Sequence, residues 1–165
     1  MNRKLRPNAA DFAKDLTSGT SATVSLPLIA IPHVINQPMA NSLLSDLLPR
    51  LNHSHPSIRK KTIVTLFRLA LVFPETLRPA WPKIKERLLD DNEDPSVTAA
   101  IVNVVCELGW RRPQDFLPLA PRLFELLVEG NNNWMGIKII KLVRLSCREL
   151  ELLVDSRVVR YVNTT

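Results

Sequence analysis

Hydrophobic residues recur along this chain at the spacing that places them on one face of a helix. In the first clear stretch, leucines occupy positions i, i+3, i+4 and i+7, at Leu44, Leu47, Leu48 and Leu51. Stripes of this kind predict helices over residues 39–51, 57–73, 79–89, 95–108, 115–128 and 134–145. Pro49 falls inside the first helix and predicts a kink there, because proline cannot donate the backbone hydrogen bond of a helix.

The helical stripes repeat after about forty residues. The apolar positions of one stripe recur 39 residues later and again 38 residues after that: Ile58, Thr62 and Leu66, then Val97, Ile101 and Val105, then Met135, Ile139 and Val143. Two-helix units of this length are typical of HEAT and armadillo repeats, in which each unit buries its apolar side against the next. The period therefore predicts an all-α fold, a right-handed α-solenoid of HEAT/armadillo-like helical hairpin repeats.

The composition changes along the chain and suggests three parts. Residues 1–25 are polar and small, which predicts a flexible leader that contributes nothing to a core. Residues 26–145 carry the helical repeats, and residues 146–165 form an atypical C-terminal tail. Neither end has the polar outer face of a capping repeat, so we expect this chain to be a fragment of a longer array.

The residue counts argue against several classes of function. With 13 prolines and 4 glycines, the chain has no glycine-rich loop for phosphate or dinucleotide binding, and no catalytic motif stands out. We therefore expect no enzymatic activity and no cofactor. The longest apolar stretch, residues 24–35, is too short to span a bilayer, so we expect no transmembrane segment and a cytoplasmic protein.

Basic residues outnumber acidic ones, 22 to 16, and suggest a binding patch. Arg59, Lys60 and Lys61 lie in the first turns of a helix, where cations oppose the helix dipole and usually have another role. Lys138 and Lys141 lie on the polar side of the last predicted helix. These five residues are candidates for binding an acidic partner or anionic lipid from one shared concave face. The alternative interpretation is an ordinary solvated helix surface.

A nucleic-acid-binding helical repeat is a second function that the positive charge would allow. Such a protein needs a continuous basic groove or a code of base-reading side chains. The basic charge is instead interrupted by an acidic run over residues 86–94, which we expect to be an exposed loop. We therefore expect no nucleic-acid partner.

Two local features could carry chemistry. His53 and His55 form half of a possible metal site, but no further ligands follow at zinc-like spacing, so a polar loop with capping duty is favoured and no metal is expected. Cys106 could be a nucleophile, but its place in an apolar helix stripe favours burial in the core. Cys106 and Cys147 are both expected to be buried free thiols of a protein in a reducing compartment.

Several long strings resemble the trunk of the adaptin large subunits. They include PSIRKKT at residues 56–62, residues 77–88, 94–97, 103–108 and 117–121, and NNWMGIKIIKL at residues 132–142. The chain is most similar to the delta-adaptins of the third adaptor complex, in a fungal version.

The resemblance implies an α-solenoid trunk in a four-subunit coat, with a second large, a medium and a small subunit as partners. It also implies a peripheral location on Golgi or endosomal membranes and a role in sorting cargo to the vacuole or lysosome.

Overall fold

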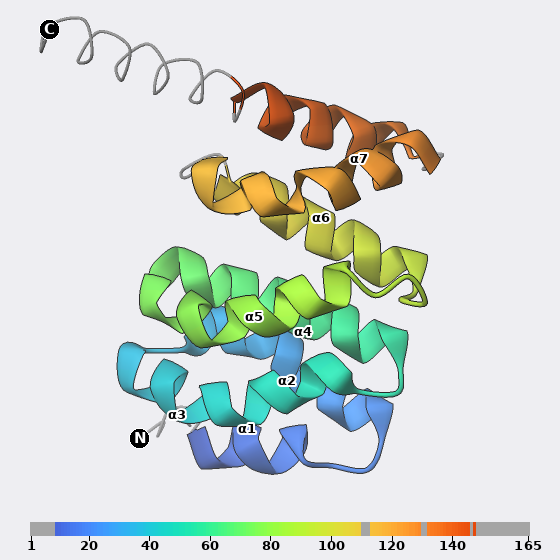
Figure 1. The fold of residues 1–165 in the computed structure, drawn as a ribbon. Helices are drawn as coiled ribbons and strands as arrows, with labels where there is room; N and C mark the ends of the chain where they lie inside the picture. Colours follow the sequence, from blue (N-terminus) through green and yellow to red (C-terminus); the bar gives the residue numbers. More distant parts are fainter. Residues whose placement is uncertain (1–8, 110–112, 130–131, 146, 148–165) are drawn as a thin grey trace, which may run out of the picture. The chain divides into compact units, whose positions relative to one another are not determined.

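The computed structural model describes residues 9–109, 113–129, 132–145 and 147. The chain divides into two compact units, Met1–Ile101 and Val102–Thr165, with the division inside one helix. Within the described residues all regular structure is helical (Figure 1). The predicted all-α fold of helical hairpins is confirmed.

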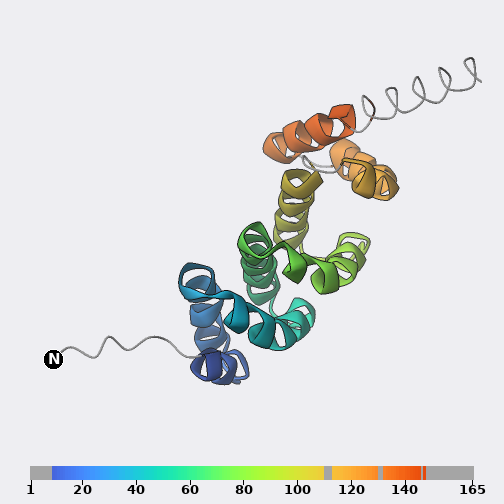
Figure 2. The same ribbon diagram turned by 90° about the vertical axis from the view of Figure 1, so that its left-hand side faces the viewer.

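Unit 1 is built from antiparallel helices joined by short turns. In chain order these are α1 (Ala9–Leu16), α2 (Ser21–Val34), α3 (Gln37–Leu47), the 3-10 helix η1 (Leu48–Asn52), α4 (Pro56–Val72), the 3-10 helix η2 (Pro74–Thr76), α5 (Leu77–Leu88) and the start of α6 (Pro95–Gly109). Figure 2 shows α2 and α4 side by side, and α4 also packs against η1 and α5. This arrangement gives unit 1 one continuous apolar core.

The helix boundaries of α3 and α4 follow the proline positions. The α-helical hydrogen bonding of α3 stops at Leu47, and η1 carries Pro49, so the predicted kink is confirmed. Pro56 occupies the first turn of α4, where a missing N–H costs nothing, and the helix ends at Val72, before Pro74. Helix α5 begins two residues earlier than predicted.

The prediction of a flexible leader over residues 1–25 is corrected where the structure describes this segment. Helix α1 lies entirely within it, and α2 begins at Ser21 after Thr20, whose side chain caps the helix. Leu16 and Val24 are fully buried. A few apolar side chains at helical spacing are enough to anchor these residues to the core, although their overall composition is polar.

A buried hydroxyl joins α2 to α4. Helix α2 contains Pro32, which has no N–H to give to the carbonyl of Leu28 one turn earlier. Thr65 Oγ1 of α4 lies 2.5 Å from this carbonyl oxygen and 2.8 Å from that of Lys61, and its one proton is shared between them. The neighbouring helix thus replaces a hydrogen bond that the proline removes.

Unit 2 contains the second half of α6, the 3-10 helix η3 (Pro113–Leu119), α7 (Ala120–Glu129) and a helix over residues 133–145. The predicted helix over 115–128 is therefore 3-10 up to Leu119 and α-helical from Ala120, with Pro118 inside η3. Gly109 ends α6, and a Cβ there would lie 2.5 Å from Leu142 Cδ1. Glycine at this position allows the helix over 133–145 to approach closely.

No helix in the described part of the chain has both the length and the apolar character needed to cross a membrane.

Candidate interaction surface

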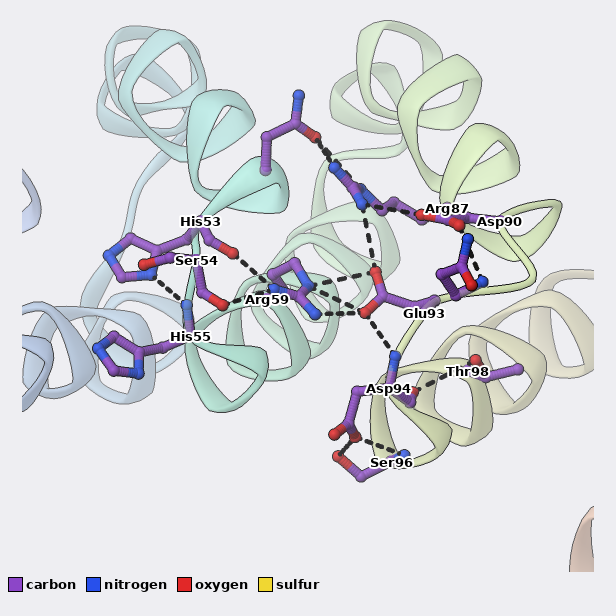
Figure 3. A network of polar contacts seen from close by, with 12 residues as sticks. His53, Ser54, His55, Arg59, Arg87, Asp90, Glu93, Asp94, Ser96 and Thr98 are labelled. Carbon is purple, nitrogen blue, oxygen red and sulfur yellow. Dashed lines mark hydrogen bonds and ion pairs between the residues drawn. The ribbon is translucent and has the colours of Figure 1, made fainter.

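Arg59, the first residue of the predicted basic patch, is bound within unit 1. Its Nε lies 3.0 Å from Glu93 Oε1, and its Nη2 lies 2.5 Å from the same oxygen (Figure 3). Its Nη1 donates to the backbone carbonyls of His53, at 2.7 Å, and Ser54, at 2.9 Å. The guanidinium is therefore used in a structural network and is not available to a partner.

The carboxylate of Glu93 is the centre of this network. Its side chain is completely buried, and it also accepts a backbone N–H of Asp94 at 2.8 Å and lies 3.5 Å from Arg87 Nη1. Arg87 Nη2 donates to Asn52 Oδ1 at 2.9 Å, and Arg87 Nη1 lies 3.3 Å from Asp90 Oδ2. We call Arg59, Arg87 and Glu93 the loop clamp, because they join the loop before α4 to the loop before α6. The prediction that residues 86–94 form an exposed acidic loop is wrong for residues 86–88, which belong to α5, and for Glu93, which is buried.

Asp94 directly precedes α6, which begins at the predicted residue 95. Its carboxylate accepts the hydroxyl of Ser96 at 2.6 Å and the backbone N–H of Ser96 at 2.8 Å. These hydrogen bonds hold the pKa of Asp94 below its ordinary value, since they favour the ionised form.

The other two residues of the predicted patch on α4, Lys60 and Lys61, differ in exposure. Lys60 is exposed, whereas Lys61 is half-buried and lines a groove between α2 and α4. The structure thus separates Arg59 from its two neighbours, and only the lysines remain as candidates for binding.

Lys138 and Lys141 both lie on the helix over residues 133–145 in unit 2. The ammonium group of Lys138 donates to Asn103 Oδ1 and, at 2.7 Å, to Glu107 Oε1, and it lies 5.5 Å from the ring centre of Trp134. Lys141 is exposed. Because the two lysine pairs belong to different units, their predicted sharing of one face stays a prediction.

The two histidines form a local stack. The rings of His53 and His55 lie 5.6 Å apart, and His53 Nδ1 accepts the backbone N–H of His55 at 3.0 Å. Burial, with the positive charges of His55, Arg50 and Arg59, lowers the pKa of His53. The predicted capping duty is corrected, since His55 at the start of α4 makes no side-chain cap bond. Among the described residues, no group of three or more potential metal ligands comes together.

Cys106 is buried in unit 2, as predicted from its helix stripe. Burial raises the pKa of its thiol to about 12, so the thiol stays protonated and unreactive near neutral pH. Cys147 is exposed, which corrects the prediction that both thiols are buried.

We therefore expect iodoacetamide at pH 8 to alkylate Cys147 much faster than Cys106, because only an accessible thiolate reacts. Mass spectrometry of the two cysteine peptides would measure both rates. Both residues should react at similar rates in urea, and equal rates in the folded protein would contradict the burial of Cys106.

The comparisons with known proteins agree with this architecture. The sequence profile of the adaptin N terminal region matches residues 10–164. The chain belongs to the adaptin family. This match begins before residue 26 and ends after residue 145, the bounds predicted for the repeats. The predicted tail at residues 146–165 lies outside the described residues, except for Cys147.

Among curated relatives, the chain is similar to the delta subunits of AP-3 complexes. It is 45% identical to AP-3 complex subunit delta of Schizosaccharomyces pombe over 129 residues, or 78% of this chain and 15% of the relative. It is 41% identical to AP-3 complex subunit delta-1 of Bos taurus, over 78% of this chain and 10% of the relative. The predicted resemblance to the delta-adaptins is confirmed, and the chain spans only a small part of these relatives' length.

A chain in a homology model of the full-length AP-3 complex, in an intermediate open conformation, has a similar fold. The two superpose with a TM-score of 0.70 and 33% sequence identity, over 95% of this chain and 28% of that chain. The adaptin fold is therefore supported by both the sequence match and the structural match.

Sequence reasoning missed residues of the loop clamp and residues beside the groove that Lys61 lines. Glu93 and Arg87 were assigned to a solvated loop, and His33 and Arg68, which flank the groove of Lys61, were not considered. Arg68 stands seven residues after Lys61, two turns along the same face of α4, and this spacing could have indicated it.

Proposed function

We propose that this chain is part of the trunk of an interaction subunit in a vesicle-coat adaptor complex of the AP-3 type. The subunit would act through its surfaces, without enzymatic chemistry or cofactor, in protein transport from Golgi or endosomal membranes to the vacuole or lysosome. The observation that carries this proposal is the adaptin match over residues 10–164, together with 41–45% identity to AP-3 delta subunits.

The proposed partners are the other subunits of such a complex: a second large, a medium and a small subunit. We also propose peripheral attachment to the cytoplasmic face of these membranes. Lys60, Lys61, Lys138 and Lys141 are proposed to contact an acidic partner or anionic lipid. Support comes from the exposure of Lys60 and Lys141, which leaves their charges open to solvent.

The alternative of nucleic-acid binding has less support. Four of the basic side chains, those of Arg59, Arg87, Arg122 and Lys138, already form ion pairs within the protein. A nucleic-acid groove depends on cations that are free to replace counterions on phosphates. Fewer basic side chains are therefore available to bind nucleic-acid phosphates than the positive net charge suggests.

Co-expression with the other three adaptor subunits would test the adaptor role. We expect the affinity-tagged chain to recover at least one of them, with a tagged full-length delta subunit as the positive control. Ile84→Asp, which places a charge at a fully buried position, should abolish recovery by unfolding the trunk. If the full-length subunit recovers its partners and this chain recovers none, the proposal fails for this part of the trunk.

A further inference from the structure

A groove runs along unit 1 between α2 and α4, the two helices that lie side by side in Figure 2. Its volume is about 230 Å³. The apolar floor includes Ile29 and Pro32 of α2 and Val64 of α4, and the side chains of Lys61, Arg68 and His33 lie around it. The groove therefore combines an apolar floor with positively charged edges.

The apolar floor is open to solvent. Ile29 is 56% exposed and Val64 is 38% exposed, although both belong to helices that also carry fully buried apolar side chains. Covering such side chains removes apolar surface from water and is favourable.

The positive charge of the groove is not neutralised by the protein. Neither α2 nor α4 contains an aspartate or glutamate. Arg59 of α4 is paired with Glu93, but the ammonium group of Lys61 forms no ion pair or hydrogen bond with any described residue. Within the described part of the chain, the guanidinium of Arg68 makes a polar contact only with His33, with 3.4 Å between Arg68 Nη1 and His33 Nε2. Two cations beside an apolar surface thus lack anionic partners.

The spacing of the two helices is fixed beneath the groove. The hydroxyl of Thr65 holds α4 to the carbonyl of Leu28 in α2, and both residues are buried. A binding surface that is already formed loses less entropy when a ligand is bound.

We propose that this groove binds an acidic segment of a partner protein in an extended conformation. Two carboxylates of the segment pair with Lys61 and Arg68, and an apolar side chain between them packs on Ile29 and Val64. A bilayer surface fits less well, because it is flat and would be met by the exposed Lys60 as readily as by the recessed Lys61. The inference rests on groove chemistry alone and does not depend on the adaptor role.

Fluorescence anisotropy with the full chain and a labelled peptide tests this proposal. The peptide carries aspartate and glutamate on both sides of one central leucine. We expect Lys61→Ala and Arg68→Ala each to weaken binding about tenfold, the effect of losing one charge-assisted hydrogen bond. Lys14→Ala is the control, since it removes the same charge from an exposed position of unit 1 outside the groove, and it should change the affinity less than about twofold.

Two further peptides separate the contributions of charge and apolar packing. Replacing the acidic residues by asparagine and glutamine should abolish binding, and replacing the leucine by glycine should weaken it. Circular dichroism will establish that each variant is folded. The proposal is overturned if the acidic peptide does not bind, if the uncharged peptide binds equally well, or if Lys14→Ala and Lys61→Ala have the same effect. It is also overturned if only vesicles containing phosphatidylserine are bound.

Discussion

Replacing Glu93 by glutamine is expected to destabilise the protein by about 3 kcal/mol, because it leaves the guanidinium of Arg59 without its counter-charge and leaves Arg87 with only Asp90. The Glu93 side chain is completely buried, and that of Arg59 is only 13% exposed, so water cannot replace the lost carboxylate efficiently. Urea unfolding followed by circular dichroism would measure the change in the free energy of unfolding.

Glu125→Gln provides the matched control for this experiment. Glu125 also pairs with an arginine, Arg122, at 3.1 Å, but its side chain is 57% exposed. Exposed pairs of this kind contribute little, so we expect a loss below about 0.5 kcal/mol. Equal losses for the two variants would mean that burial does not set the strength of the loop clamp.

Thr65→Val is expected to cost about 1–2 kcal/mol, since it keeps the shape of the side chain but leaves the buried carbonyl of Leu28 without a donor. The cause can be tested in a Pro32→Ala background, in which residue 32 regains an N–H that can reach this carbonyl. In that background we expect the cost of Thr65→Val to fall by more than half. Thermal unfolding of the four proteins in this double-mutant cycle would give the coupling energy.

Thr62→Val is the control for the cycle. Thr62 is also buried, but its hydroxyl donates to Ile58, a carbonyl of its own helix that already accepts a backbone N–H. Its cost should be smaller and should not depend on residue 32. If Thr65→Val costs the same in both backgrounds, then the missing N–H of Pro32 is not what the hydroxyl compensates.

The helical repeats could be predicted because they depend on local spacing. The stripe through Ile58, Thr62 and Leu66 is buried in α4, and its counterpart beginning at Val97 is buried in α6. The prediction was wrong for the first helices, since α1 and α2 are anchored by isolated apolar residues such as Leu16 and Val24. Helix α2 also contains two internal prolines, and a contact with α4 compensates for one of them. Such compensation cannot be seen in a local pattern.

The candidate site could be predicted only in part, for a similar reason. A cation in the first turn of α4 suggested that Arg59 has a special role, but its partner Glu93 lies 34 residues further along the chain. The spacing of basic residues indicated that Lys61 is on the surface, and it could not reveal that α2 contributes an apolar floor beside it. These features depend on which helices become neighbours in the folded chain.

The loop clamp also affects the order in which the chain opens. The position 39 residues after Arg59 is Thr98, which donates its hydroxyl to Asp94 within its own turn and cannot bridge two loops. Fluctuations in repeat proteins begin where adjacent units hold each other least. Arg59 also donates hydrogen bonds to the carbonyls of His53 and Ser54. We therefore expect local unfolding that begins at either end of the described helices to stop at this segment.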